Sequence, residues 1–372
     1  MRNSILETDV VIVGGGPSGL VAAIAARRSG FSVVVADASR PPIDKACGEG
    51  IMPDGLAVLT ELGVHLPKEK MAKFHGIRFV DSVHSVAANF ARGYGLGIRR
   101  TVLHQALVDR AIQAGVETKW GTRVIGLARG GVLLQDLEIR CRWLVGADGL
   151  NSRVRSWSGL DENLSNTLRF GYRRHYLVKP WTDLVEVHWT TNGQLYVTPV
   201  SEHEVCVALV TRDRNLRMKE AMAACASLPV ELSHAVPATR EQGAITANRR
   251  LHSVVRGSCA LIGEASGCVD AVTGEGLSLA FRQALALEKA WLADDLRIYE
   301  REHRRLMRLP TTMASVMLLM DRLHGLRRRT LRAFSSQPEL FQTLLAVHTG
   351  AASPLAFGLR GATSFGWRML TA

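Results

Sequence analysis

The sequence predicts an α/β fold with three parts. These are a three-layer domain on a buried parallel sheet, a second domain with an antiparallel or mixed sheet, and a C-terminal helical region. Short β-branched strands, each followed by glycines and a helix, occur near the N-terminus and again after residue 258. Residues 168–212 alternate polar and apolar side chains, which is typical of antiparallel strands. Arginine-rich segments after residue 296 favour amphipathic helices.

The first element is a strand, a glycine turn and a helix. Asp9 to Val13 is a β-branched run, the turn Gly14 to Gly19 reads G-G-G-P-S-G, and Leu20 to Arg28 is an alanine-rich helix. A second buried strand from Phe31 to Ala36 ends at an acid. This is G-x-G-x-x-G in the strand-helix-strand context that binds dinucleotides, with the diphosphate at the helix N-terminus. The expected contacts are Gly14, Gly16, Pro17, Ser18, Gly19, Asp37, Ala38 and Arg40.

Two later segments repeat the pattern of a strand that ends in glycine and an acid. Trp143 to Val145 precedes Asp148-Gly149, and Cys259 to Ile262 precedes Gly263-Glu264. A loop with Gly274 and Gly276 then opens a long helix from Leu277 to about residue 294. Ligands of open parallel sheets bind at the carboxyl ends of the strands, so these acids are expected to lie near the first turn.

These motifs resemble those of one flavoprotein family. It includes the para-hydroxybenzoate hydroxylase-like FAD-dependent monooxygenases and the geranylgeranyl reductase-like enzymes, and the resemblance covers nearly the whole chain up to about residue 300. It implies a three-layer, Rossmann-like FAD-binding domain, FAD as cofactor and NAD(P)H as co-substrate. The contacts that it implies are Asp148-Gly149 for both nucleotides, Gly263-Glu264 for the FAD ribityl or ribose, Arg100 near the diphosphate, and Val124 on a strand near the adenine.

Two positions depart from the family pattern. Glu264 stands where the family usually has aspartate, and we expect this longer side chain to fold back toward a cofactor hydroxyl. Ala271 stands where the family has proline, so the loop before the long helix lacks a rigid residue.

A loop after the second strand is expected to approach the flavin ring. The stretch Lys45-x-Cys47-Gly48-Glu49-Gly50 is similar to the K-x-C-G motif of the geranylgeranyl reductase branch, which implies that Cys47 and Gly48 pass close to the isoalloxazine. Cys47 is also compatible with a small packing residue. The helix N-terminus at Gly274 to Gly276 is expected to stabilise reduced flavin, with Glu275 pointing away from the ring.

The domain boundaries follow from this assignment. We expect an FAD-binding domain at 1–75, 95–165 and 245–300, a substrate domain at 76–94 and 166–244, and a helical region at 301–372. No catalytic residue is identified. The pocket candidates are Cys47 in the loop and, on the alternating strands, Arg173, His175, His188, Trp189 and Tyr196. Residues of the strand type are more often ordinary sheet-surface residues than substrate contacts.

Composition adds limits on class and location. The chain has 372 residues, 47% hydrophobic and 22% charged, which excludes disordered and fibrous proteins. The six cysteines form no C-x-x-C pair and no zinc spacing with histidine, so no metal is expected. A signal-like segment and a run of 18 apolar residues are both missing, which favours a cytoplasmic protein.

The basic charge is concentrated near the C-terminus. The formal net charge is +12, and residues 296–332 contribute +7 through ten arginines and three acids, with an apolar Met313 to Met320 run between them. One interpretation is peripheral contact with an anionic membrane, and the other is a helix with a solvated arginine face. Nucleic acid is not an expected partner, because no recognised module accompanies the charge.

The leading functional hypothesis is an NAD(P)H-dependent FAD monooxygenase. It would act on a hydrophobic aromatic or polyketide-like small molecule, as in secondary metabolism. A second hypothesis is the reduction of prenyl double bonds, which Lys45 to Gly50 favours. A third is a noncatalytic flavoprotein or a lipid-surface binding protein, which the arginine-rich end favours.

Overall fold

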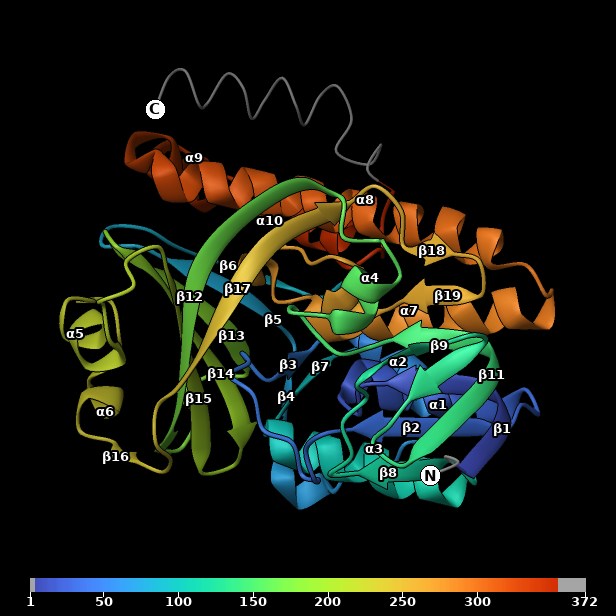
Figure 1. Ribbon diagram of the computed structural model, residues 1–372. Coiled ribbons are helices and arrows are strands. Elements are labelled where there is room, and N and C mark those ends of the chain that lie inside the picture. The colour runs from blue at the N-terminus through green and yellow to red at the C-terminus, as the bar shows by residue number, and fades with distance from the viewer. Residues whose placement is uncertain (1–3, 354–372) are drawn as a thin grey trace.

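The computed structural model describes residues 4–353 and contains two large sheets, a small third sheet and ten α-helices within that range. Figure 1 shows the two large sheets side by side, with the C-terminal helices along one side of both. This is the α/β architecture that the sequence predicts. Residues 354–372 of the expected C-terminal region lie outside the described residues.

The first sheet carries the glycine turns. Its strand order is β18-β19-β11-β1-β2-β8, and the pairs from β19 to β8 are parallel, whereas β18 pairs antiparallel with β19. Two short strands, β9 and β10, continue antiparallel from β11. The strands are β1 (Ser4–Val13), β2 (Val33–Asp37), β8 (Glu117–Trp120), β9 (Gly126–Ala128), β10 (Gly131–Leu133), β11 (Leu137–Gly146), β18 (Val255–Arg256) and β19 (Cys259–Leu261).

Helices cover this sheet. α1 (Pro17–Arg28) packs against α3 (Arg100–Gln113) and α7 (Gly276–Leu292), while α4 (Arg153–Trp157) packs against β11 and β9. α1 begins at Pro17, three residues before the expected start at Leu20. Proline suits the first position of a helix, because the N–H group that it lacks would have no partner within the helix there. Leu20 to Ala26 are buried, and their small side chains let α1 lie close to its neighbours.

The second sheet is mainly antiparallel and has the order β16-β12-β15-β14-β13-β5-β6, with β17 paired to β12. Only β5 and β13 run parallel. The predicted alternating strands are all present. The strands are β5 (Gly76–Val80), β6 (Ser85–Asn89), β12 (Asn163–Leu177), β13 (Leu184–Trp189), β14 (Gly193–Ser201), β15 (Glu204–Thr211), β16 (Val236–Pro237) and β17 (Gln242–Leu251).

Each face of the second sheet carries its own buried apolar cluster. One face packs on α5 (Met218–Ala223) and α6 (Val230–Ser233). The other packs on side chains from the C-terminal helices, including Met320, Leu331 and Phe341. These helices are α8 (Leu296–Arg322), α9 (His324–Ser336) and α10 (Pro338–His348).

The remaining elements lie between the two large sheets. The third sheet consists of β3 (Gly50–Ile51), β7 (Gly95–Ile98) and β4 (Met71–Phe74). Strands β4 and β7 of this sheet contact β14 of the second sheet. α2 (Pro53–Glu61) packs against α7. Three short 3-10 helices are η1 (Lys68–Lys70), η2 (Gly263–Ser266) and η3 (Ala271–Thr273).

Three local expectations differ from the structure. The boundary expected at residue 245 falls inside β17, because that strand pairs with β12 from Gln242 to Leu251. The boundary at residue 300 falls inside α8. Val124 lies in the loop between β8 and β9 rather than on a strand. In the described part of the chain, we find no helix with the length and hydrophobicity needed to cross a membrane.

Candidate functional site

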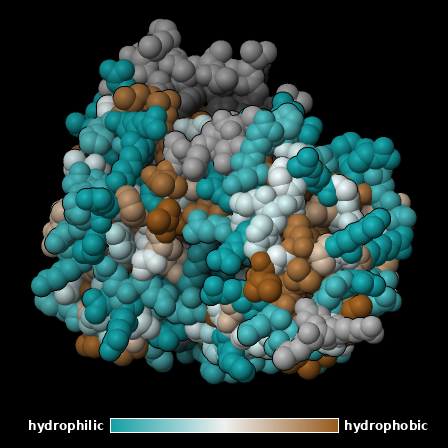
Figure 2. All heavy atoms as spheres, in the orientation of Figure 1, coloured by the Kyte–Doolittle hydropathy of each residue, from teal (hydrophilic) through white to brown (hydrophobic). Residues whose placement is uncertain are grey.

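A cavity of about 860 Å³ lies between the two large sheets and contains nearly all of the predicted cofactor contacts. Figure 2 shows a mostly hydrophilic face with hydrophobic residues gathered around a hollow near its centre. Of the predicted contacts, only Gly19 and Arg40 do not line this cavity. The predicted residues that do are Gly14, Gly16, Pro17, Ser18, Asp37, Ala38, Cys47, Gly48, Arg100, Val124, Asp148, Gly149, Gly263, Glu264, Gly274 and Gly276.

Gly14, Gly16 and Gly19, the three glycines of the G-x-G-x-x-G pattern, have different physical roles. Gly14 has φ +112°, and a Cβ there would clash with the carbonyl of Ala147. A Cβ on Gly19 would clash with the carbonyl of Gly14. A Cβ on Gly16 would meet nothing within 4 Å, so this backbone faces the open cavity. Two glycines therefore allow the turn to pack, and the third leaves room for a ligand.

The N-terminus of α1 is open to an anion. Gly16 is its N-cap and forms no side-chain capping bond, so the first N–H groups of the helix point into the cavity without a side-chain partner. Nearby, Asp37 accepts hydrogen bonds from the backbone N–H of Gly15 at 2.7 Å and of Ser39 at 2.7 Å. The carboxylate is thus oriented by the turn and keeps further lone pairs for a hydroxyl donor.

Asp148 has a structural task in addition to the predicted one. Its carboxylate accepts from Ser152 Oγ at 2.5 Å and from the backbone N–H of Arg153 and Val154 at 2.7 and 3.1 Å. These bonds cap the start of α4. Gly149 has φ +79°, so glycine is needed for the turn that follows.

The Lys45 to Gly50 segment lines the cavity. On the side away from the cavity, buried polar and charged side chains hydrogen-bond to this segment and fix its position. Glu49 is 2% exposed and adopts φ 60°, a conformation that costs about 1–3 kcal/mol. Its carboxylate accepts from the Arg100 backbone N–H at 2.9 Å and lies 2.6 Å from His175 Nε2. Arg173 donates to Asp44 at 2.6 Å and contacts His175 Nδ1 at 3.1 Å. Because a guanidinium only donates, Nδ1 accepts and the His175 proton lies on Nε2, toward Glu49.

One cluster in the described part of the chain has metal-ligating residue types: Glu49, His175 and Cys206. Both imidazole nitrogens of His175 are already engaged, one by Glu49 and one by the cationic Arg173. Burial raises the pKa of the Cys206 thiol well above its usual value, and a neutral thiol is a poor metal ligand. The donor set therefore fits a hydrogen-bonded network that fixes the cavity wall better than it fits a metal.

The pocket candidates do not share one location. Cys47 and Tyr196 line the cavity, whereas Arg173 and His175 lie behind its wall. The prediction for His188 is wrong, because this residue points to the opposite face of the second sheet, where it contacts Ser227 and Glu186. Its neighbour Trp189 packs in the apolar cluster under the C-terminal helices.

Tyr196 belongs to an apolar wall. Its hydroxyl donates a hydrogen bond to the carbonyl of Val272 at 2.9 Å, and burial raises the pKa of the phenol. The phenol therefore stays neutral, and its proton is engaged by Val272. The other side chains of this wall that line the cavity are Met52, Phe74, Val185, Ala208 and Val210. The cavity thus combines a polar turn-rich half with an apolar half.

At the start of α7, Gly274 has φ +67° and the helix has no side-chain cap. Burial raises the pKa of Glu275, and its Oε1 lies 3.7 Å from His348 Nε2 on α10. Glu275 also lines the cavity, so its orientation relative to a flavin remains a prediction.

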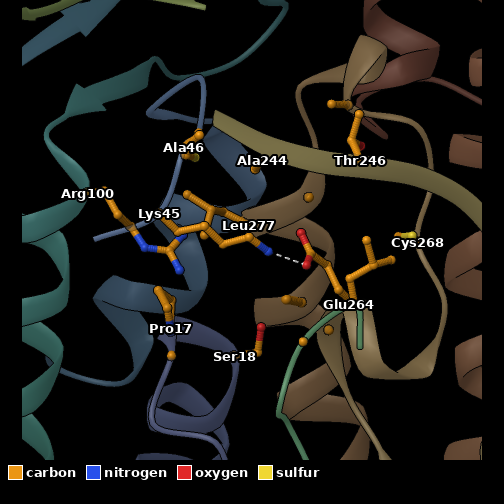
Figure 3. Close-up of a pocket in the computed structure, with 18 of the residues that line it drawn as sticks. Pro17, Ser18, Lys45, Ala46, Arg100, Ala244, Thr246, Glu264, Cys268 and Leu277 are labelled. Carbon is orange, nitrogen blue, oxygen red and sulfur yellow. Dashed lines mark hydrogen bonds and ion pairs between the residues drawn. The ribbon is translucent and has the colours of Figure 1, made fainter. Parts of the chain in front are cut away.

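Two functional contacts were missed from the sequence. Lys45 forms an ion pair with Glu264, with Nζ and Oε2 2.5 Å apart (Figure 3). Arg169 is 2% exposed and donates to Asp270 at 3.0 Å, tying β12 to the loop before η3. Each joins residues more than 100 positions apart, and no local pattern marks either pair.

Comparison with known proteins relates this chain to FAD-binding proteins, among them reductases and monooxygenases. Residues 7–297 match the FAD binding domain family. Menaquinone reductase of Mycolicibacterium smegmatis is 28% identical over 308 residues, covering 73% of each chain. Rifampicin monooxygenase of Streptomyces venezuelae is 28% identical over 163 residues, covering 41% of this chain and 34% of its own. A geranylgeranyl bacteriochlorophyll reductase-like structure from Thermoplasma acidophilum superimposes with TM-score 0.68 at 17% identity, covering 93% and 92%.

Proposed function

Because the chain belongs to the FAD binding domain family, we propose that this FAD-dependent oxidoreductase uses NAD(P)H and O2 to oxygenate a hydrophobic small molecule. One observation carries the proposal. The same cavity of about 860 Å³ is lined on one side by glycine turns and a helix N-terminus, which suit a dinucleotide, and on another by an apolar wall, which suits a hydrophobic substrate. This volume is within the range of ligand and cofactor sites.

The residues of the cavity fit FAD. Gly16 faces open space, as a backbone that approaches a diphosphate must. Arg100 lines the cavity, and its Nε is buried without a hydrogen-bond partner among the described residues. A buried guanidinium N–H without a partner is costly, and an anionic ligand would remove that cost.

The protein's part in the reaction follows from these positions. Bound FAD supplies hydride acceptance from NAD(P)H and, once reduced, the activation of O2. The turn from Gly14 to Gly19, Arg100 and Asp37 would hold the cofactor, and the N-terminus of α7 would stabilise negative charge in the cavity. Substrate, O2, NAD(P)H and one proton would give the oxygenated product, water and NAD(P)⁺. NAD(P)H supplies two of the four electrons that reduce O2, and the substrate supplies the other two.

The apolar wall favours oxygenation over chemistry in which a side chain of the wall protonates the substrate. Tyr196 is bonded to Val272, and His175 and Glu49 are bonded to each other, so these groups are not free to donate a proton to a substrate. Oxygen transfer to a bound hydrophobic substrate needs orientation and exclusion of water, which an apolar wall supplies.

A second candidate is the reduction of an isoprenoid double bond. The observation that favours it is the position of Cys47 in the cavity wall, within the segment that resembles the reductase branch. Its thiol is the one side-chain proton donor of that wall segment not bonded to a second side chain in the described part of the chain. The menaquinone reductase relative covers more of this chain than the monooxygenase relative does.

Location and partners are part of the proposal. We place the protein in the cytoplasm, where six free cysteines would remain reduced, and in secondary metabolism. We also propose peripheral contact with an anionic membrane through α8 and α9.

Product analysis separates the two reactions. Purified holoprotein would be incubated with NADPH and either 2-naphthol or menaquinone as probe, under 18O2 and separately without oxygen. Oxygenation predicts a product that carries one 18O atom and no product without oxygen. A menaquinone product that gains two hydrogens in its isoprenoid chain in the absence of oxygen, measured after the ring has been reoxidised to the quinone, would instead establish the second candidate.

A further inference from the structure

Lys45 and Glu264 meet across the cavity from two separate segments of the chain. Lys45 lies between β2 and β3, and Glu264 lies on η2, 219 residues later. In Figure 3 the bridge between them lies with β17 and its residues Ala244 and Thr246 on one side and Pro17 and Ser18 on the other. All six of these residues line the cavity.

The bridge depends on the length of the acidic side chain. The family pattern has aspartate at position 264, and the extra methylene of Glu264 is used here to reach Lys45 Nζ at 2.5 Å. The side chain therefore extends across the opening, where the sequence led us to expect it to fold back. A carboxylate that already has an ammonium partner can still accept a hydrogen bond from a cofactor hydroxyl.

Both ends of the bridge are fixed at the backbone. Gly263 donates to Gln283 Oε1 at 2.9 Å, and a Cβ on Gly263 would clash with Ser18 Oγ, so η2 lies close against the start of α1. On the other side, Asp44 is bonded to Arg173 and Glu49 to His175. The side chains of Lys45 and Glu264 themselves lie partly in solvent, with exposed fractions of 39% and 46%.

From this arrangement we propose that Lys45 and Glu264 form a clasp that closes over bound FAD and slows its release. The inference rests on the proposed FAD binding in this cavity. The bridge lies between the Pro17–Ser18 turn and β17, over the space that a dinucleotide reaching from the Gly16 turn to the Cys47 segment would occupy. With the cofactor below it, the ion pair would have to open before the cofactor leaves. Exposed ion pairs contribute little free energy, which corresponds to about two- to fivefold in a release rate.

The test is a double-mutant cycle on FAD release. Holoprotein would be mixed with an excess of a flavin-scavenging apoprotein, and the release rate followed by flavin fluorescence. Lys45→Gln and Glu264→Gln should each release FAD about two- to fivefold faster, and the double variant no faster than the faster single variant. Glu264→Asp should behave like Glu264→Gln, because the shorter acid cannot reach Lys45.

A charge exchange and a matched control complete the design. Lys45→Glu combined with Glu264→Lys should return the rate to within about twofold of the unmodified protein. The control is Glu117–Lys119 on β8, an ion pair of similar exposure that does not line the cavity. Lys119→Gln should leave release unchanged.

The outcomes that overturn the clasp are distinct from those that overturn FAD binding. Purified protein without flavin would contradict the proposed function. Holoprotein in which Glu264→Gln alone speeds release, with Lys45→Gln neutral or the two effects additive, would mean that Glu264 acts directly on the cofactor and that no clasp exists.

Discussion

At the scale of single residues, the glycines of the first turn separate folding from binding. Gly14 and Gly19 sit where a side chain would strike backbone, so any larger residue there disturbs the packing of α1 on β1. Gly16 lies two residues away in the same turn, yet faces open cavity. A motif that reads as one unit in the sequence therefore divides into positions that hold the fold and one that leaves room for a ligand.

Gly16→Val is expected to fold normally and to lose FAD. The valine side chain finds no protein atom within reach of its Cβ, but it fills the space beside the α1 N-terminus. The measurements are flavin absorbance per chain after purification and the thermal unfolding of the apoprotein. Gly126→Val on β9, which also faces open space but lies outside the cavity, is the control and should keep its flavin. Retention of FAD by Gly16→Val would show that the turn does not approach the diphosphate.

At the scale of elements, the strands and turns follow from the sequence because their signals are local. A β-branched run, a positive-φ glycine and a helix N-terminus are all defined within about ten residues, and β1, α1, β11 and α7 lie close to where the sequence places them. The sequence does not determine which face of a strand is turned toward the cavity. Period-2 alternation says that His188 shares a face with Glu186, but not which face meets the cavity, and both faces of β13 are buried.

Long-range pairs mark the limit of sequence reasoning in the site. Lys45–Glu264 joins two distant segments of the expected FAD-binding domain, and Arg169–Asp270 joins that domain to the second sheet, so both pairs depend on tertiary packing. The substitution of glutamate for aspartate at position 264 was visible in the sequence, but its partner was not. The carboxylate reaches outward to Lys45 because η2 is held against α1.

The proposed membrane contact rests on exposed residues of α8 and α9. Val316, Leu319 and Leu323 are 48%, 47% and 51% exposed, and their spacing places them along one face near the end of α8. Arg322, Arg328 and Arg329 are exposed in the same two helices, and among residues 4–353 no acid forms an ion pair with them. Apolar side chains within a basic face favour the headgroup region of an acidic bilayer.

Vesicle sedimentation tests this surface. The protein should bind phosphatidylglycerol vesicles at low salt and not phosphatidylcholine vesicles. Arg328→Gln with Arg329→Gln should weaken binding at least tenfold, because each arginine near an acidic surface contributes about 1 kcal/mol. The control with the same charge change is Arg92→Gln with Arg129→Gln, at exposed positions far along the chain. Equal weakening by both pairs, or no vesicle binding at all, would mean that the arginine face is only solvated.

At the scale of the whole molecule, two parts line the cavity and the third packs against them. The parallel sheet supplies the glycine turns, the second sheet supplies the apolar wall, and the C-terminal helices pack on both α7 and β6. The buried pairs Arg169–Asp270 and His175–Glu49 link β12 to the loops that line the cavity, so the two domains are joined at the site itself. The cavity is thus a property of the assembled chain rather than of either sheet.

The central claim is that this cavity holds one FAD that NAD(P)H can reduce. The most direct measurement is anaerobic titration of the purified protein with NADPH, and separately with NADH, while the flavin absorbance is recorded. The account predicts one flavin per chain, bleached by one equivalent of at least one of the two nicotinamide nucleotides. Protein that binds no flavin, even after incubation with excess FAD, would contradict it.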